Sequence, residues 1–414
     1  MGTQHAILIL TGLLLLAIVI QPLARMIRLP FAATLVLAGF AASELLVLAG
    51  HDTGIRAGNF HDLIFYIFLP ILVFESAYNI NARLLLDNLL PILILAVPVL
   101  LLSTVITGTL VYLGIGHPTG FPWIAALLTG ALLSATDPVA VVTLLRRMGV
   151  PERLAILMEG ESLFNDATAI VIFGILLAIA TGTGAPLRAS EALLHFLGVF
   201  FGGLLTGAVV GVAFARVSAW IREPAARALA TVISAYSAFM LAETVLQVSG
   251  VMSVLVTGII LGQRTHASTP DTAIDFIRLL WEFIAYVANA LVFLLMGVTI
   301  TLVMFEERWL AMLIGIAGVF VARAAGIFMF IPLLNKLMRA QPISRPYQVV
   351  MLWGGMRGAV TLALALALPT TLDAWWTIQS IAFGVVLFTL FAQATTTAPL
   401  VRYYGLYKPG TERN

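Results

Sequence analysis

The sequence contains no cysteine and few charged residues. Without cysteine the chain can form no disulfide, bind no metal through thiolates and use no cysteine nucleophile. Charged residues make up 10% and hydrophobic residues 61% of the 414 residues, whereas a soluble domain has about 25% charged residues. This composition excludes an ordinary soluble protein and predicts an all-α polytopic membrane protein.

Several motifs that would indicate other functions are also absent. No G-x-x-x-x-G-K-[ST] sequence marks an ATP site, so we do not expect a primary pump. The chain has neither H-E-x-x-H nor a nucleophilic serine with an intramembrane histidine partner, which argues against an intramembrane protease. The first residues lack the basic region of a signal peptide, so the first apolar stretch is expected to remain as a helix. We expect no enzyme, no cofactor, no soluble regulatory domain, and neither nucleic acid nor a soluble protein as partner.

Apolar runs between clusters of glycine, proline and charge predict about 13 transmembrane helices. The candidate spans cover residues 6–23, 31–49, 62–79, 89–113, 123–145, 154–179, 191–215, 226–247, 250–263, 276–303, 309–331, 347–368 and 376–401. If these spans alternate sides, one face holds only Arg56, Arg188 and Arg308, and nearly all other basic residues fall on the opposite face. The positive-inside rule then predicts a multi-pass protein of the cell inner (plasma) membrane, with its N-terminus outside and its C-terminus in the cytoplasm.

The order of the spans predicts a single membrane transport domain over residues 1–414, with spans 1–6 and 8–13 as inverted repeats around span 7. Span five is interrupted by Pro138, and span twelve by glycines on either side of Arg357. We therefore expect two crossed discontinuous helices that line a site. Where two N-terminal and two C-terminal helix ends meet, an anion suits the first pair and a cation the second, so Asp137 and Arg357 are expected to neutralise them.

Ionisable residues inside predicted spans are costly, which makes each a candidate for function. Helical spacing in MEGESLFND places Glu159, Ser162 and Asp166 on one face of span six. Asp166, the Ser162 hydroxyl and carbonyl groups near Thr136 would supply the hard oxygen ligands that Na⁺ or Li⁺ requires. One carboxyl group holds a proton or a cation but hardly both, and that competition is sufficient for exchange.

Four further intramembrane charges remain. Glu161 and Arg323 are expected to form a buried ion pair, because each would otherwise be an uncompensated charge. Glu75 follows a helix proline in FLPILVFES and is either a further cation ligand or a modulator of the site. The role of Glu243 is left open.

Four separated segments of the sequence resemble the monovalent cation:proton antiporters, and among them the NhaP-like branch that includes the sodium/proton exchangers. These segments are FLPILVFES, ATDPVAV, GESLFND and GGMRGAV, supported by FVARAAG. With the number and order of spans, the resemblance covers nearly the whole chain. It implies an NhaA-like antiporter fold of 13 helices, a homodimer in membrane lipid, a six-helix core beside a dimer domain, and an elevator-like motion.

The resemblance also implies a role for each matched residue. It makes Asp166 the exchanging carboxylate, and the order Asn165-Asp166 resembles the electroneutral branch, in which one cation moves against one proton. The implied cation and proton site, which would hold Na⁺, comprises Asp166, Ser162, Thr136 and Glu75, with Asp137 beside them. The implied structural support comprises the Glu161–Arg323 pair, Asn165 as an orienting neighbour, and Arg357.

Two other transport functions stay open at this point. An ion channel would also carry intramembrane carboxylates, although the single Asp166 beside broken helices favours alternating access. An organic-anion transporter should present intramembrane cations to its substrate, yet both buried arginines have proposed partners. Sequence does not distinguish Na⁺ from K⁺ or Li⁺, nor does it give the direction of exchange, its pH midpoint or its regulation.

Overall fold

The computed structural model describes residues 3–26, 29–48, 63–115, 120–182, 189–268, 271–337 and 341–407. Within these ranges nearly every residue is helical and none lies in a strand. The prediction of an all-α polytopic membrane protein is confirmed. The described chain divides into two compact units, and the division falls within two continuous helices, at residues 169/170 and 289/290.

Eight helical segments of the described chain are long and apolar enough to cross a membrane. Four shorter apolar helices lie at Thr11–Ala24, Phe31–Leu45, Leu63–Asn79 and Gly250–Arg264. The expected span 347–368 belongs to neither group because it consists of two short helices separated by non-helical backbone. The eighth and ninth expected spans are separate helices, but the total of 13 stays a prediction. The eight long segments are Leu89–Gly114, Trp123–Arg147, Glu152–Ala180, Leu193–Trp220, Pro224–Leu246, Asp275–Thr299, Leu302–Leu337 and Trp375–Tyr403.

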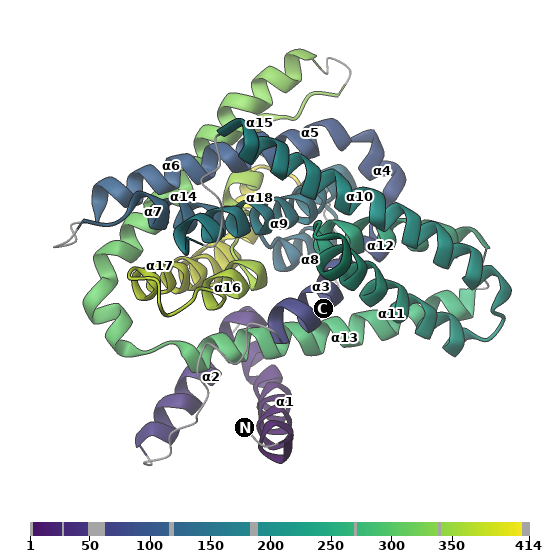
Figure 1. The fold of residues 1–414 in the computed structure, drawn as a ribbon, viewed down its shortest axis with the longest axis horizontal. Coiled ribbons are helices and arrows are strands. Elements are labelled where there is room, and N and C mark those ends of the chain that lie inside the picture. Colours follow the sequence, from purple (N-terminus) through teal and green to yellow (C-terminus); the bar gives the residue numbers. More distant parts are fainter. Residues whose placement is uncertain are drawn as a thin grey trace. The chain divides into compact units, whose positions relative to one another are not determined.

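The first unit contains residues 1–61, 89–169 and 290–414, and it holds both broken helices (Figure 1). Within it α6 packs along α7, and α14 packs against both α6 and α17. Two segments of π-helix, η3 and η5, interrupt longer apolar helices of this unit. Its helices are α1 (Thr3–Met26), α2 (Phe31–Leu48), α5 (Leu89–Ile94), η3 (Leu95–Val99), α6 (Leu100–Gly114), α7 (Trp123–Ser134), α8 (Val139–Arg147), the first part of α9 (Glu152–Ala180), the end of α13 (Asp271–Thr299), α14 (Leu302–Leu337), α15 (Arg345–Trp353), α16 (Ala359–Leu366), α17 (Trp375–Phe388), η5 (Thr389–Gln393) and α18 (Ala394–Tyr403).

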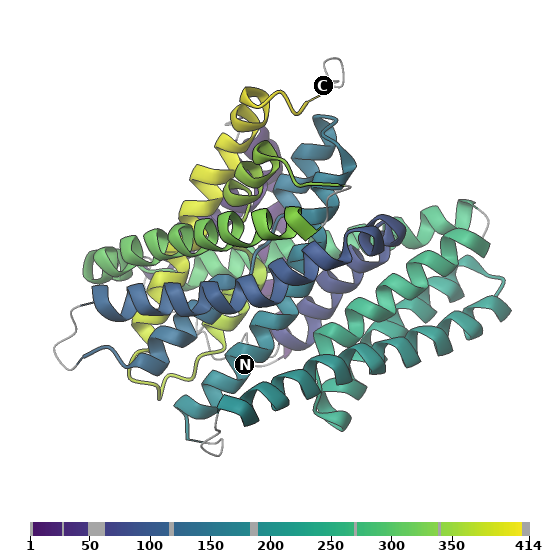
Figure 2. The same cartoon turned by 90° about the horizontal axis from the view of Figure 1, so that it is seen from above.

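The second unit contains residues 62–88 and 170–289. Figure 2 shows its helices α10, α11 and α12, coloured teal to green, packed side by side. Trp281 is fully buried and donates its indole N–H to the Thr231 hydroxyl at 2.9 Å, which ties α13 to α11. The helices are η2 (Leu63–Phe68), α3 (Leu69–Asn79), α4 (Ala82–Asp87), the second part of α9, α10 (Ala189–Trp220), α11 (Pro224–Met240), η4 (Leu241–Leu246), α12 (Gly250–Ser268) and most of α13.

Local sequence accounts for the helix ends that shape the first unit. Pro138 has no N–H to continue helix α7 and its ring clashes with the preceding turn, so α7 ends at Ser134 and α8 begins at Val139. Gly354, Gly355 and Gly358 lie in the second break, where α15 ends at Trp353 and α16 begins at Ala359. Ser344 accepts a hydrogen bond from the Tyr347 N–H at 3.5 Å and so caps the start of α15.

Candidate functional site

The two broken helices of the first unit meet through their main chains. The Asp137 N–H donates to the Met356 carbonyl at 2.8 Å, and each of these residues lies in the non-helical break of its own helix. This bond satisfies one polar group in each break, where no helical partner is available. The crossing therefore brings together helix ends from α7, α8, α15 and α16.

The two N-terminal ends at the crossing share the carboxylate of Asp137. Its Oδ1 accepts from the Val139 N–H of α8 at 3.2 Å, and its Oδ2 accepts from the Ala359 N–H of α16 at 3.5 Å. A negative charge at two positive helix ends is favourable. Gly358 is required for this close approach, because a Cβ atom there would overlap the Asp137 carboxylate.

The two C-terminal ends at the crossing are each bound by an arginine. Arg357 Nη1 donates to the carbonyl groups of Ser134 and Ala135 at the end of α7, at 3.1 and 2.8 Å. Arg323 Nε and Nη2 donate to the Met351 carbonyl in the last turn of α15, at 3.2 and 3.0 Å. Each guanidinium thus supplies the positive charge that a helix C-terminus favours and the donors that its free carbonyls need.

Arg323 also pairs with Glu161 of α9, as the sequence predicts. The pair is bidentate, with Nη1 to Oε1 at 2.6 Å and Nη2 to Oε2 at 3.1 Å. Only 1% of Glu161 and 7% of Arg323 is exposed. A Cβ atom on Gly355 would overlap the Arg323 guanidinium, so this glycine admits the arginine between α14 and the second break.

Two side chains of α9, those of Ser162 and Asn165, bind Thr136 in the first break. The Ser162 hydroxyl donates to the Thr136 carbonyl at 2.5 Å. Asn165 donates from Nδ2 to the Thr136 hydroxyl at 2.6 Å, and its Oδ1 accepts from the Thr136 N–H at 3.3 Å. Asn165 therefore fixes both the main chain and the side chain of Thr136, and it lies next to Asp166 in the sequence.

Asp166 is the acidic group with an unsatisfied oxygen at this place. Its Oδ1 is buried and accepts no hydrogen bond from the described residues. Asp137 and Arg357 are its charged neighbours. A buried carboxylate oxygen without a protein donor is suited to a proton or a cation as its partner. The described residues hold no cluster of three or more His, Cys, Asp or Glu side chains that would suit a resident multivalent metal.

Glu75 lies on α3 of the second unit, and it accepts hydrogen bonds from residues of the same helix. Its Oε1 accepts from Asn79 Nδ2 at 2.9 Å, one helical turn away, and its Oε2 accepts from the Ser76 hydroxyl at 3.4 Å. Its place in the cation site stays a prediction.

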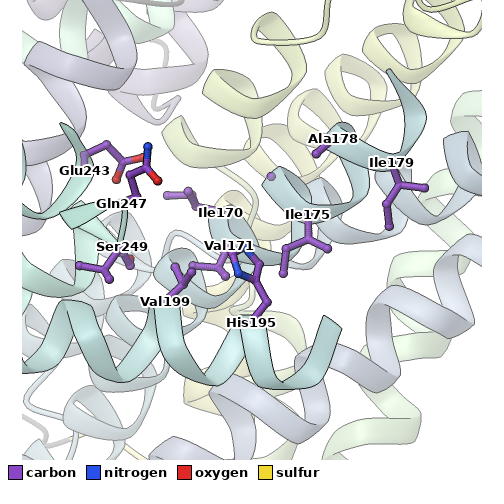
Figure 3. A pocket seen from close by; sticks show the side chains of 12 residues that line it. Ile170, Val171, Ile175, Ala178, Ile179, His195, Val199, Glu243, Gln247 and Ser249 are labelled. Carbon is purple, nitrogen blue, oxygen red and sulfur yellow. The ribbon is translucent and has the colours of Figure 1, made fainter. Parts of the chain in front are cut away.

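Glu243 of the second unit, whose role the sequence leaves open, makes a structural contact at the start of a helix. Its Oε2 accepts from the Gly250 N–H at 2.9 Å and so caps the N-terminus of α12. It also lines a cavity of about 340 Å³ whose walls come mainly from apolar residues of α9 and α10 (Figure 3). In this view Glu243 and Gln247 lie at one end of the cavity, with His195 below and Ile175 toward the other end.

Sequence reasoning missed two features of the site. The Thr389 hydroxyl, in η5, accepts from the Arg357 N–H at 3.2 Å and donates to the Val386 carbonyl at 2.9 Å. The second is the contact of Arg323 with the Met351 carbonyl at the end of α15, which adds to the predicted ion pair with Glu161. The π-helical segment η5 is a structural signal for the role of Thr389, because π-helix often occurs at functional sites. In the sequence, a single threonine in an apolar run gives no such signal.

Comparisons with known proteins agree on one family. Residues 12–403 match the family described as "Sodium/hydrogen exchanger, transmembrane". The chain is 37% identical over 354 residues to the Na⁺/H⁺ antiporter ApNhaP of Aphanothece halophytica, covering 85% of this chain and 66% of that protein. It is 38% identical over 341 residues to the low-affinity Na⁺/H⁺ antiporter NhaS1 of Synechocystis, covering 81% of this chain and 63% of that protein.

A solved structure shows the same fold. The sodium proton antiporter MjNhaP1 of Methanocaldococcus jannaschii matches with a TM-score of 0.80 at 20% identity, covering 97% of this chain and 99% of that chain. This chain spans about two thirds of the length of the two curated relatives above.

Proposed function

Because the chain belongs to the transmembrane sodium/hydrogen exchanger family, we propose that it is a secondary transporter that exchanges Na⁺ for H⁺ across a membrane. Exchange needs no cofactor, because the energy comes from one ion gradient. Li⁺ and K⁺ are alternative cations, and the direction follows whichever gradient is larger.

The observation that carries this proposal is the buried Oδ1 of Asp166, which has no described hydrogen-bond donor and lies on the same helix face as Ser162. A proton satisfies that oxygen in one state and a dehydrated cation satisfies it in the other. Thr136 and Ser162 supply the neutral oxygens for the cation, and Asn165 holds Thr136 in place through two hydrogen bonds. Glu75 and Asp137 complete the proposed site.

One titrating carboxyl group supports electroneutral exchange of one cation for one proton. The arrangement gives little support to transport of an organic anion, because the guanidinium groups of Arg323 and Arg357 are held by protein carbonyls and by Glu161. The Glu161–Arg323 pair and Arg357 keep the crossing rigid in this proposal, and Asp137 serves the N-terminal helix ends.

The remaining features of the proposal concern assembly and placement. We propose a homodimer in the inner (plasma) membrane, with the C-terminus and the basic face in the cytoplasm. We further propose that spans 1–6 and 8–13 are inverted repeats within a single transport domain, which changes access to the site by alternating exposure. The separation of basic residues in the sequence supports the orientation.

Reconstitution tests the function directly. Purified protein in liposomes with a trapped pH dye and an acidic lumen should alkalinise the lumen when Na⁺ is added outside, with the membrane potential clamped. Asp166→Asn should abolish this response, because an amide cannot exchange a proton for a cation. Asp373→Asn, a matched change at an exposed loop position, should leave it unchanged. If Na⁺, Li⁺ and K⁺ all fail to move protons, or if Asp166→Asn is as active as the wild type, the proposal is wrong.

A further inference from the structure

An ion pair with two alternative partners lies where α8 ends and α9 begins in the first unit. Arg146 Nη2 is 2.7 Å from Glu159 Oε2 and 3.5 Å from Glu152 Oε1, so one nitrogen is shared between two carboxylates. The side chains of Arg146 and Glu152 are 42% and 53% exposed, whereas that of Glu159 is only 15% exposed. Arg146 therefore joins an outer carboxylate in solvent to an inner one that is largely buried.

The inner carboxylate lies on the helix face that carries the proposed exchange site. Glu159, Ser162 and Asp166 are separated by three and four residues on α9, which places them in one row. Seven residues separate Glu159 from Asp166, or about 10 Å along the helix axis. The row thus begins at Glu159, whose side chain is 15% exposed and contacts the exposed Arg146, and ends at the buried oxygen of Asp166 that no described group satisfies.

The Arg146 pair differs from the Glu161–Arg323 pair in a way that decides what it can do. Arg323 is buried, makes a bidentate pair with Glu161 and also binds the Met351 carbonyl. If the pair separated, two buried charges would be left without a partner of opposite charge. The Arg146 side chain is 42% exposed and lies 3.5 Å from Glu152, so Glu152 and water can take over its guanidinium when a cation replaces it on Glu159. The Glu161–Arg323 pair is therefore expected to stay intact, whereas Arg146 is able to exchange one carboxylate partner for another.

We propose that Glu159 is an access residue for the transported cation, and that Arg146 is its competitor. When a hydrated monovalent cation approaches this end of α9, Arg146 moves to Glu152 and the cation takes its place on Glu159. The cation then passes along the row to Ser162 and Asp166. This inference rests on the proposed exchange function and adds two residues, at the face proposed to be cytoplasmic, that set the apparent cation affinity from that side.

Everted membrane vesicles, with this face outward, test the inference through the apparent KM for Na⁺ in the pH-dye assay. Glu159→Gln should raise KM at least fivefold with the maximal rate within twofold of wild type. Arg146→Gln should lower KM about threefold, because the competitor is gone. Arg147→Gln removes the same charge at the next, exposed residue, and it should leave KM within 1.5-fold. In right-side-out vesicles, where Na⁺ is added to the opposite face, the apparent KM for Na⁺ should be the same in all three variants as in the wild type.

A charge-swapped variant separates access from simple support of the fold. Glu159→Arg combined with Arg146→Glu keeps an ion pair between α8 and α9 but places a cation in the row. KM should stay at least fivefold above wild type. If the swap restores wild-type KM, or if Glu159→Gln leaves KM within twofold or shifts it equally on both faces, Glu159 is structural and the inference is wrong. If the swapped protein does not fold, the two single variants still test the inference. The access role predicts that KM rises in Glu159→Gln and falls in Arg146→Gln, whereas a purely structural ion pair predicts that KM changes in the same direction in both.

The same measurements distinguish the two proposals from each other. A wild-type protein that moves no protons in response to any cation refutes the exchange function. A wild-type protein that exchanges Na⁺ normally, with unchanged KM in Glu159→Gln, refutes only the access role.

Discussion

Removal of Arg323 should destabilise the protein more than removal of its partner Glu161. Arg323 makes a bidentate ion pair with Glu161 and two further hydrogen bonds to the Met351 carbonyl at the end of α15. Glu161→Gln breaks the ion pair but leaves the contacts to Met351 in place. Arg323→Met breaks both sets, so the C-terminus of α15 loses its donors as well.

The structure sets the size of this difference. Breaking a buried ion pair costs about 3 to 5 kcal/mol, and this applies to either single variant. Hydrogen bonds from a charged donor contribute about 1.5 to 3 kcal/mol, and these are lost only with Arg323. We therefore expect Arg323→Met to be about 2 kcal/mol more destabilising than Glu161→Gln. The double variant should be less destabilised than Arg323→Met alone, because Glu161→Gln removes the buried carboxylate that Arg323→Met leaves without a partner.

Reversible unfolding in mixed detergent micelles, followed by tryptophan fluorescence, measures these free energies. Arg216→Met is the matched control, since Arg216 is exposed on α10, and it should change stability by less than about 0.5 kcal/mol. Equal destabilisation by Arg323→Met and Glu161→Gln would show that the contacts to Met351 do not stabilise α15. Additive effects in the double variant would show that the two side chains act independently.

Three further predictions concern the crossing and the exchanging carboxyl group. Gly358→Ala should abolish exchange because its Cβ overlaps the Asp137 carboxylate, whereas Gly174→Ala, whose Cβ meets nothing within 4 Å, should leave exchange intact in the same dye assay. Thr389→Val should lower stability by about 1 kcal/mol through loss of its hydrogen bond to the second break. Thr395→Val loses only bonds to Phe391 and Ala392 in the preceding turn and should not lower it, so equal unfolding midpoints for the two variants would contradict this prediction. Since a proton excludes the cation, the apparent KM for Na⁺ should rise as pH falls, by up to about tenfold per unit, and a pH-independent KM would argue against competition.

Local chemistry explains why both broken helices could be predicted from the sequence. Pro138 removes a donor whatever the surroundings, and the glycines near Arg357 weaken a helix in any context. The Glu161–Arg323 pair was predictable by elimination, because two charges in apolar spans need partners and few candidates exist. These inferences depend on single residue types and not on details of packing.

Other parts of the site could not be predicted because they depend on groups distant in sequence. Met351 binds Arg323 only through its main-chain carbonyl, which every residue has, so its side chain does not predict the contact. Thr389 is one hydroxyl in an apolar run, and its partner lies 32 residues away. The spacing predicts that Glu159 shares a face of α9 with Ser162 and Asp166, but the sharing of Arg146 with Glu152 depends on how the end of α8 packs against α9. Glu75 lies in the second unit, and its part in the site stays a prediction.

The bond between the Asp137 N–H and the Met356 carbonyl joins two main chains. Almost any residue can occupy either position without deleting this bond, so the bond persists through substitutions that would remove the side-chain contacts of the crossing. Proline at position 137 is the one natural residue that removes the donor. The crossing therefore has one contact that is independent of side-chain identity, beside the contacts of the Asp137 carboxylate and of the two arginines, which depend on it.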